Sequence, residues 1–89
     1  MKSHLTRDFI ACFARLPPRV QEVARKNYNL WKQNPCHPSL QFKRVGQRKP
    51  VYSVRAGLGW RALGLKKNDI VVWFWIGSHA VYDGLVLQM

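Results

Sequence analysis

The sequence predicts an α+β fold in which a helical hairpin packs on one face of a three- to four-stranded, mainly antiparallel sheet. Apolar residues recur at helical spacing in the first third of the chain, and short alternating segments follow in the second half. A continuous apolar run, Ile70 to Ile76, then indicates a central strand that is covered on both faces. Because 89 residues leave no room for a second core, we expect one domain over residues 1–89.

Two helices are predicted before the strands. The first can be capped by Thr6 or Ser3 and ends at Pro17-Pro18, since proline lacks the amide donor. Pro18 also suits the first turn of a second helix. The apolar side of the first helix is expected to hold Phe9, Ile10, Phe13 and Leu16. The buried stripe of the second is expected to hold Val20, Val23, Ala24, Asn27, Leu30 and Trp31.

Strands are predicted over residues 40–45, 51–56, 60–66 and 70–76. Lys2 to Leu5 is either a short first strand or a lead without structure. Strict alternation along the last strand predicts two sets of side chains. We expect one set to pack under the helices: Ile70, Val72, Phe74 and Ile76. The other set points to the opposite face, where it needs a cover: Val71, Trp73 and Trp75.

Positive charge dominates the composition. Fifteen Lys and Arg face four acids, and the formal net charge is +11. Even if every acid paired with one base, eleven cations would lack an internal partner. An excess of this size favours a nucleic acid or an acidic protein as partner over a merely solvated surface.

The two cysteines, Cys12 and Cys36, are too few for a disulfide framework and lie in no zinc-ligand spacing. We therefore expect no metal and no cofactor, and a reducing, cytoplasmic location. Met1 to Leu16 contains no apolar signal-peptide core, and Ile70 to Ile76 is too short to span a bilayer. Neither a secretion signal nor a membrane anchor is expected.

Five motifs follow one another in a recognisable order. They are the Leu16-Pro17-Pro18 corner, Asn34-Pro35 followed by Leu40-Gln41-Phe42-Lys43, Tyr52-Ser53-Val54-Arg55, Trp60-Arg61-Ala62-Leu63, and Ile76-Gly77-Ser78-His79 with Tyr82. Through these motifs the chain resembles the RelE/ParE superfamily of bacterial toxin–antitoxin systems. The resemblance implies a compact basic toxin, silenced by a cognate acidic antitoxin whose partly disordered segment folds across the basic sheet. RelE-like members are ribosome-dependent mRNA endoribonucleases (mRNA interferases), whereas ParE-like members inhibit DNA gyrase without nuclease activity.

Metal-free RNA cleavage needs a base for the 2′-hydroxyl, an acid for the leaving oxygen and cations for the phosphorane charge. By resemblance, Arg61 would bind the scissile phosphate and Arg55 would be a second clamp. Tyr82 would be a base or a stacking platform, and the imidazole of His79 is a side chain suited to proton transfer. Lys43 could add charge on the neighbouring strand. We therefore predict Arg61, His79 and Tyr82 as catalytic, and Lys43, Arg55 and Arg61 as RNA-binding.

Other interpretations of these residues stay open. Ser53 stands where some nuclease members carry a lysine, and no glutamate lies in the sheet, so the general base is not fixed. Arg61 could instead cap the sheet by pairing with Asp83 or Asp69. Tyr82 could anchor the C-terminal segment in the core.

We predict a toxin that halts translation by cutting messenger RNA, with the ribosome and mRNA as partners. The first alternative is a ParE-like inhibitor of DNA gyrase, which does not need the basic, His and Tyr cluster. The second is a basic nucleic-acid-binding domain without toxicity.

Overall fold

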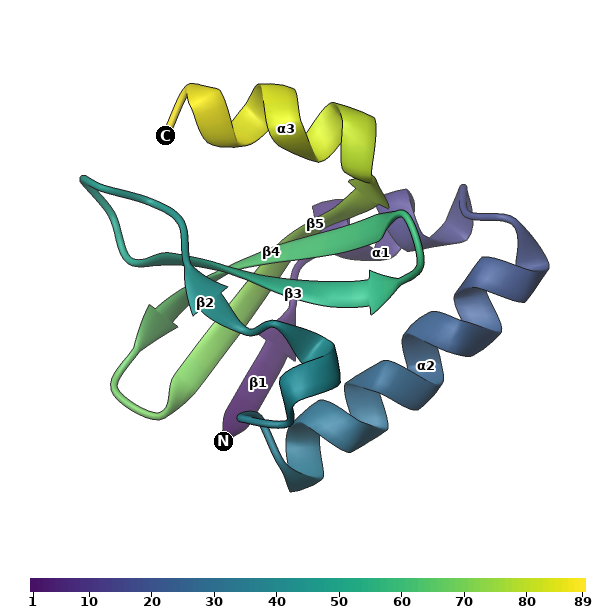
Figure 1. Ribbon diagram of the computed structural model, residues 1–89, viewed down its shortest axis with the longest axis horizontal. Coiled ribbons are helices and arrows are strands. Elements are labelled where there is room, and N and C mark those ends of the chain that lie inside the picture. The colour runs from purple at the N-terminus through teal and green to yellow at the C-terminus, as the bar shows by residue number, and fades with distance from the viewer.

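The computed structural model describes residues 1–89 and has the predicted α+β class (Figure 1). The elements in chain order are β1 (Lys2–Leu5), α1 (Arg7–Ala14), α2 (Pro18–Gln33), the 3-10 helix η1 (Pro38–Leu40), β2 (Lys43–Arg44), β3 (Val51–Gly57), β4 (Trp60–Lys67), β5 (Ile70–Ser78) and α3 (His79–Leu87). The strand order is β1-β5-β4-β3-β2, so the sheet has five strands rather than three or four. The N-terminal strand β1 pairs parallel with β5, and the other pairs are antiparallel.

The corner between α1 and α2 is fixed by side chains as well as by proline. Thr6 caps α1 as predicted, because its hydroxyl accepts a hydrogen bond from the Phe9 amide at 3.1 Å. Pro18 occupies the first turn of α2. The side-chain amide of Gln21 donates to the carbonyls of Phe13 at 3.0 Å and Leu16 at 3.2 Å. The end of α1 is thus tied to the beginning of α2.

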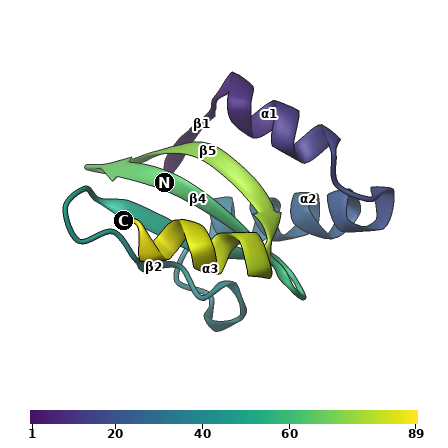
Figure 2. The same cartoon turned by 90° about the horizontal axis from the view of Figure 1, so that it is seen from above.

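The helices form a layer on each side of the sheet. Figures 1 and 2 show α1 and α2 on one face and α3 on the other. The larger core lies under α1 and α2, where the rings of Trp31 and Trp73 meet edge to face with centroids 5.3 Å apart. A smaller cluster of Val51, Leu63 and Tyr82 lies under α3. The C-terminal segment, for which the sequence suggested no element, is therefore a helix that covers the second face.

The predicted alternation along β5 is confirmed for Trp75 and Ile76 but wrong for Val71, Trp73 and Phe74, because the strand contains a bulge. Leu63 pairs with Trp75 but Gly64 pairs with Trp73, so Phe74 is one residue too many for its neighbour β4. The extra residue exchanges the two faces partway along the strand. Three β5 residues belong to the core under α1 and α2: Val71, Trp73 and Ile76. Phe74 and Trp75 pack against the cluster under α3.

No helix of this chain combines the length and the hydropathy of a membrane-spanning segment.

Candidate functional site

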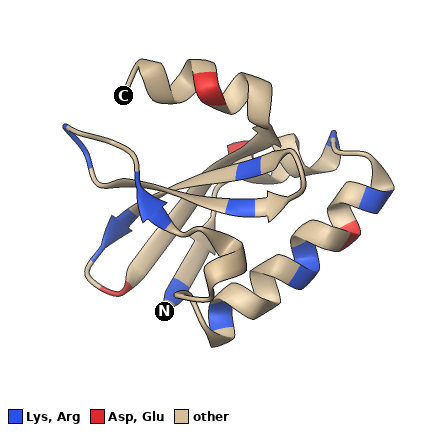
Figure 3. Cartoon of the chain, viewed as in Figure 1, with Lys and Arg blue, Asp and Glu red and all other residues tan.

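Arg55 and Arg61 face each other directly across β3 and β4. The preceding pair on the same face is Ser53 with Leu63, and Leu63 belongs to the cluster under α3. The arginines therefore lie on the α3 side of the sheet, beyond the beginning of that helix. Both are half-buried, and Figure 3 shows basic positions on β3 and on β4 close to the turn that joins these strands. Like charges directly opposite each other destabilise a sheet, so this pair would be relieved by an anion.

No carboxylate supplies that anion. No Lys or Arg nitrogen in the chain lies within 4.0 Å of a carboxylate oxygen, and the one ion pair joins a histidine to an aspartate. The alternative in which Arg61 pairs with Asp83 or Asp69 is therefore wrong. The fifteen cations of the sequence are all free of internal carboxylates.

The Arg61 guanidinium is held from one side only. Its Nη2 donates to Oε1 of Gln41 at 2.8 Å, across the row that Arg55 occupies. Its Nη1 is buried and has no hydrogen-bond partner. Unpartnered buried donors are rare, and a guanidinium fork normally takes two acceptors. Nη1 of Arg61 thus lacks a hydrogen-bond acceptor, which a bound anion could supply.

Arg55, Arg61 and Gly77 lie opposite one another on β3, β4 and β5 and form one row across the sheet. Gly77 leaves the third position of this row without a side chain. It pairs with Arg61 on β5, and a Cβ atom there would lie 2.5 Å from Cζ2 of Trp75. The indole of Trp75 therefore fills the space beside Arg61 that any other residue at position 77 would need. The glycine of the Gly-Ser-His motif therefore has a packing role.

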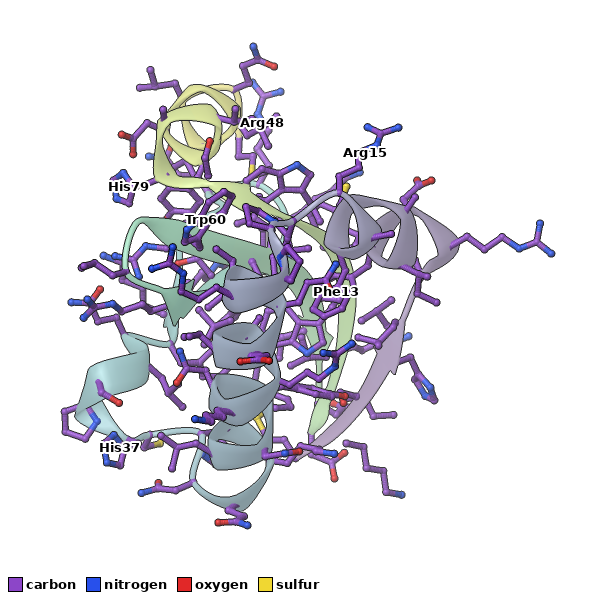
Figure 4. All side chains as sticks on the ribbon, turned by 90° about the vertical axis from the view of Figure 1, so that its right-hand side faces the viewer. Phe13, Arg15, His37, Arg48, Trp60 and His79 are labelled. Carbon is purple, nitrogen blue, oxygen red and sulfur yellow. The ribbon has the colours of Figure 1, made fainter.

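His79 begins α3 at the edge of the same row. Its amide donates to the Gly59 carbonyl at 2.8 Å, which ties the helix start to the β3–β4 turn two residues before Arg61. Its Nδ1 lies 3.2 Å from Oδ2 of Asp83, with side chains that are 47% and 61% exposed. The arrangement leaves Nε2 free at the surface, where Figure 4 shows the ring.

Asp83 is the functional candidate that the sequence reasoning missed. The signal was its spacing of four residues from His79, which brings two side chains together only on a helix. Because no helix was expected after residue 76, that spacing carried no meaning. An aspartate on Nδ1 selects the tautomer with a free Nε2, which is the arrangement of a general base.

Tyr82 is turned into the core. It is 7% exposed, and its hydroxyl lies 3.1 Å from the Ser53 Oγ. The structure thus gives it the anchoring role that was the alternative interpretation, although its ring lies 5.5 Å from that of His79. Lys43 is exposed and pairs with Ser53, so it flanks the Arg55 row from the neighbouring strand. The sequence-predicted residues are therefore gathered on one face, with the Tyr82 hydroxyl withdrawn from it.

A second feature is an apolar groove of about 290 Å³ on the opposite face, between α1, α2 and the sheet. Ile10 lines it and is 55% exposed, so the expected burial of this residue is wrong. Trp31 and Trp73 also line the groove, and the indole nitrogens of both are buried without a hydrogen-bond partner. Arg25 stands at its rim with its guanidinium 5.0 Å from the Phe13 ring centroid. The groove is therefore an unfilled and largely apolar surface.

Comparison with known proteins identifies the class of molecule. Residues 18–84 match the family model described as a ParE-like toxin domain. The chain therefore belongs to this toxin family, and the predicted membership of the RelE/ParE superfamily is confirmed. Among curated proteins, no sequence matches this chain.

Solved structures agree on the fold. YafQ from Escherichia coli superposes with a TM-score of 0.72 at 10% identity, over 91% of this chain and 96% of that one. RelE in the RelB–RelE antitoxin–toxin complex from Methanococcus jannaschii gives 0.71 at 12% identity, over 91% and 96%. The isolated Escherichia coli RelE toxin gives 0.64 at 16% identity, over 98% and 96%. At these identities the likeness establishes the fold alone.

Proposed function

We propose that this toxin is a metal-independent endoribonuclease that cuts messenger RNA on the ribosome and so halts translation. The observation that carries the proposal is the cross-strand pair of Arg55 and Arg61, which has no carboxylate partner, together with an exposed histidine that is held by an aspartate and tied by its amide to the β3–β4 turn. These residues would supply the base and the cations that phosphodiester cleavage by a 2′-oxygen requires, and water would supply the acid.

The proposed reaction follows from these positions. Nε2 of His79 takes the proton of a ribose 2′-hydroxyl, and the 2′-oxygen then forms a bond to the adjacent phosphorus. Arg61 and Arg55 neutralise the charge that develops on the phosphorane oxygens. The bond from phosphorus to the 5′-oxygen breaks, and that oxygen takes a proton from water. The products are a 2′,3′-cyclic phosphate and a 5′-hydroxyl.

Substitution of Arg61 tests the proposal. Expression of the wild type should arrest growth, and primer extension should show codon-spaced cuts in translated messages. Arg61→Ala should reduce the cutting rate by about 10²–10³-fold, the usual cost of one donor to a developing oxyanion. Circular dichroism checks that the variant is folded. A folded Arg61→Ala protein that cuts as fast as the wild type would show that the site is misplaced.

Gyrase inhibition is the second candidate, because the matching family model is the ParE-like one. It predicts a DNA damage response with intact messages on expression. An unchanged growth rate would instead favour a basic binding domain without toxicity.

The sequence predicted that a segment of the cognate acidic antitoxin folds across the basic sheet. We also propose that this antitoxin silences the toxin by docking an amphipathic segment in the groove between α1 and α2. The groove offers apolar walls, and twelve of its fifteen lining residues are hydrophobic. The exposed cations of the two helices, which outnumber Asp8 and Glu22, are Arg7, Arg15, Arg19, Arg25, Lys26 and Lys32. A partner with one apolar and one acidic face matches both features. The test is salt-sensitive binding of the purified toxin to the product of the neighbouring gene, and salt-independent binding would contradict it.

A further inference from the structure

A second group of cations lies at the opposite end of the sheet from Arg55 and Arg61 (Figure 3). This basic end consists of Lys43, Arg44, Arg48, Lys49, Lys66 and Lys67. They come from β2, the loop after it and the last residues of β4. The segments are neighbours, because the Lys66 amide donates to the Pro50 carbonyl at 3.0 Å and Val51 pairs with Leu65.

Two members of the basic end have partners within the fold. Arg44 donates from Nε to the Gly46 carbonyl at 2.9 Å and from Nη2 to the Gln47 carbonyl at 3.4 Å, which fixes the loop. Lys66 places its Nζ 5.5 Å from the Tyr52 ring centroid. The remaining four are exposed and make no side-chain hydrogen bond or ion pair: Lys43, Arg48, Lys49 and Lys67.

The basic end continues the row of the candidate site. Lys43 pairs with Ser53, which is two residues from Arg55 and on the same face of the sheet. Lys67 follows Arg61 by six residues along β4, a distance of about 20 Å at the usual rise of an extended strand. α3 covers Leu63 between these two positions, so the open route between the two ends runs along the β2 edge of the sheet, past the exposed Lys43. An anion that contacts both ends must therefore be an extended polymer.

We propose that the basic end binds the phosphate backbone of single-stranded RNA, on the same strand whose scissile phosphate lies at Arg55 and Arg61. The inference rests on the proposed function, and it extends the candidate site from one phosphate to a track. Lysine and arginine contacts to phosphates add affinity without reading sequence. The basic end thus strengthens binding of long strands and leaves any codon preference unchanged.

A length series of uncleavable 2′-O-methyl RNA oligonucleotides tests the track. The test variant carries Arg48→Gln, Lys49→Gln and Lys67→Gln. The matched control carries Arg7→Gln, Arg15→Gln and Lys26→Gln, which remove the same charge from exposed positions on the helix side. Figure 4 shows Arg15 pointing away from the sheet. Affinity is measured for each protein and each length over a range of salt concentrations.

The wild type should bind longer oligonucleotides more tightly, and the test variant should lose that gain. The slope of log affinity against log salt should become shallower by about 2 in the test variant, since each phosphate contact to a single strand contributes about 0.7. The control should keep the slope of the wild type. Equal slope changes in both variants, or a length gain retained by the test variant, would overturn the track. Tighter binding of duplex DNA than of any oligonucleotide would also overturn it.

The binding result does not depend on catalysis. Because these oligonucleotides cannot be cut, the increase of affinity with oligonucleotide length is measured independently of the cleavage of translated messages. Intact messages with wild-type toxin would count against the nuclease alone.

Discussion

The two faces of the sheet differ in size of core and in polarity. The face under α1 and α2 carries the larger core, with Trp31 at 1% and Trp73 at 2% exposure. The face under α3 carries a cluster of three buried residues, a hydroxyl pair at its centre and the two arginines at its margin. Apolar burial supplies most of the stability of a small domain, so the first face holds the fold together. The second face can therefore tolerate uncompensated charge.

This division explains where the unsatisfied groups lie. On the helical-hairpin face they are two indole donors beside an apolar groove. On the α3 face the unsatisfied group is a guanidinium nitrogen of Arg61. Each face thus lacks a partner of a different kind, an amphipathic segment in one case and an anion in the other.

The largest expected effect is on stability and falls on the helical-hairpin face. Trp73→Ala should lower the free energy of unfolding by about 3–5 kcal/mol, because it removes a fully buried indole. Trp75→Ala is the matched control on the α3 face, where the indole is only half-buried, and it should cost clearly less. Urea denaturation followed by tryptophan fluorescence and circular dichroism measures both. Equal losses would contradict the division between the faces.

The next effect is on binding and tests the groove. Ile10→Glu should weaken antitoxin binding by roughly tenfold or more, since it places a carboxylate among apolar walls that meet an acidic partner. Leu87→Glu is the control, because Leu87 is 88% exposed on α3 and far from the groove in the layer order. Isothermal titration with the purified antitoxin compares the two. If Leu87→Glu weakened antitoxin binding and Ile10→Glu did not, the antitoxin would bind the α3 face and not the groove.

The fold could be predicted where local rules decide it. Thr6, the proline corner and the β3–β4 and β4–β5 turns all follow from residue preferences that act over a few positions. The bulge at Phe74 could not be predicted, because every residue from 70 to 76 is apolar and no polar residue marks the change of face. The pairing of β1 with β5 joins residues almost seventy positions apart, and only the folded sheet decides it.

The candidate site was predictable as a set of residues but not as a geometry. The arginines lie on neighbouring strands, and a hairpin turn between them fixes their pairing, so Arg55 and Arg61 were found together. Gln41 has a φ of 49° after η1, and nothing in its neighbours indicates that its amide would reach Arg61. The contact between Asp83 and His79 could be predicted only if α3 was recognised as a helix. The apolar residues of α3 surround the helix and do not form one stripe, so the usual helical pattern is missing.

A smaller effect separates the anchoring and catalytic roles of Tyr82. Tyr82→Phe should lower the free energy of unfolding by about 1–2 kcal/mol, because it leaves the Ser53 hydroxyl buried without its partner. The rate of RNA cutting should stay within about twofold of the wild type once the protein is folded, whereas loss of a general base costs about 10²-fold or more. Single-turnover cleavage at low temperature measures the rate without interference from unfolding. If Tyr82→Phe greatly slowed RNA cutting without changing the free energy of unfolding, Tyr82 would be catalytic and not an anchor.

The smallest expected effect concerns Asp83. It tests whether a residue on the α3 face can affect the rate of RNA cutting without affecting stability. Asp83→Asn should leave stability within about 0.5 kcal/mol of the wild type, since the ion pair is exposed and such pairs contribute little. It should slow cutting by about two- to fivefold, because the amide no longer favours the His79 tautomer with a free Nε2. His79→Ala provides the upper limit, a loss of about 10²–10⁴-fold. In the background of His79→Ala, the Asp83→Asn change should have no further effect on the rate. If it slows both backgrounds equally, Asp83 acts on the RNA or on α3 and does not act through the histidine.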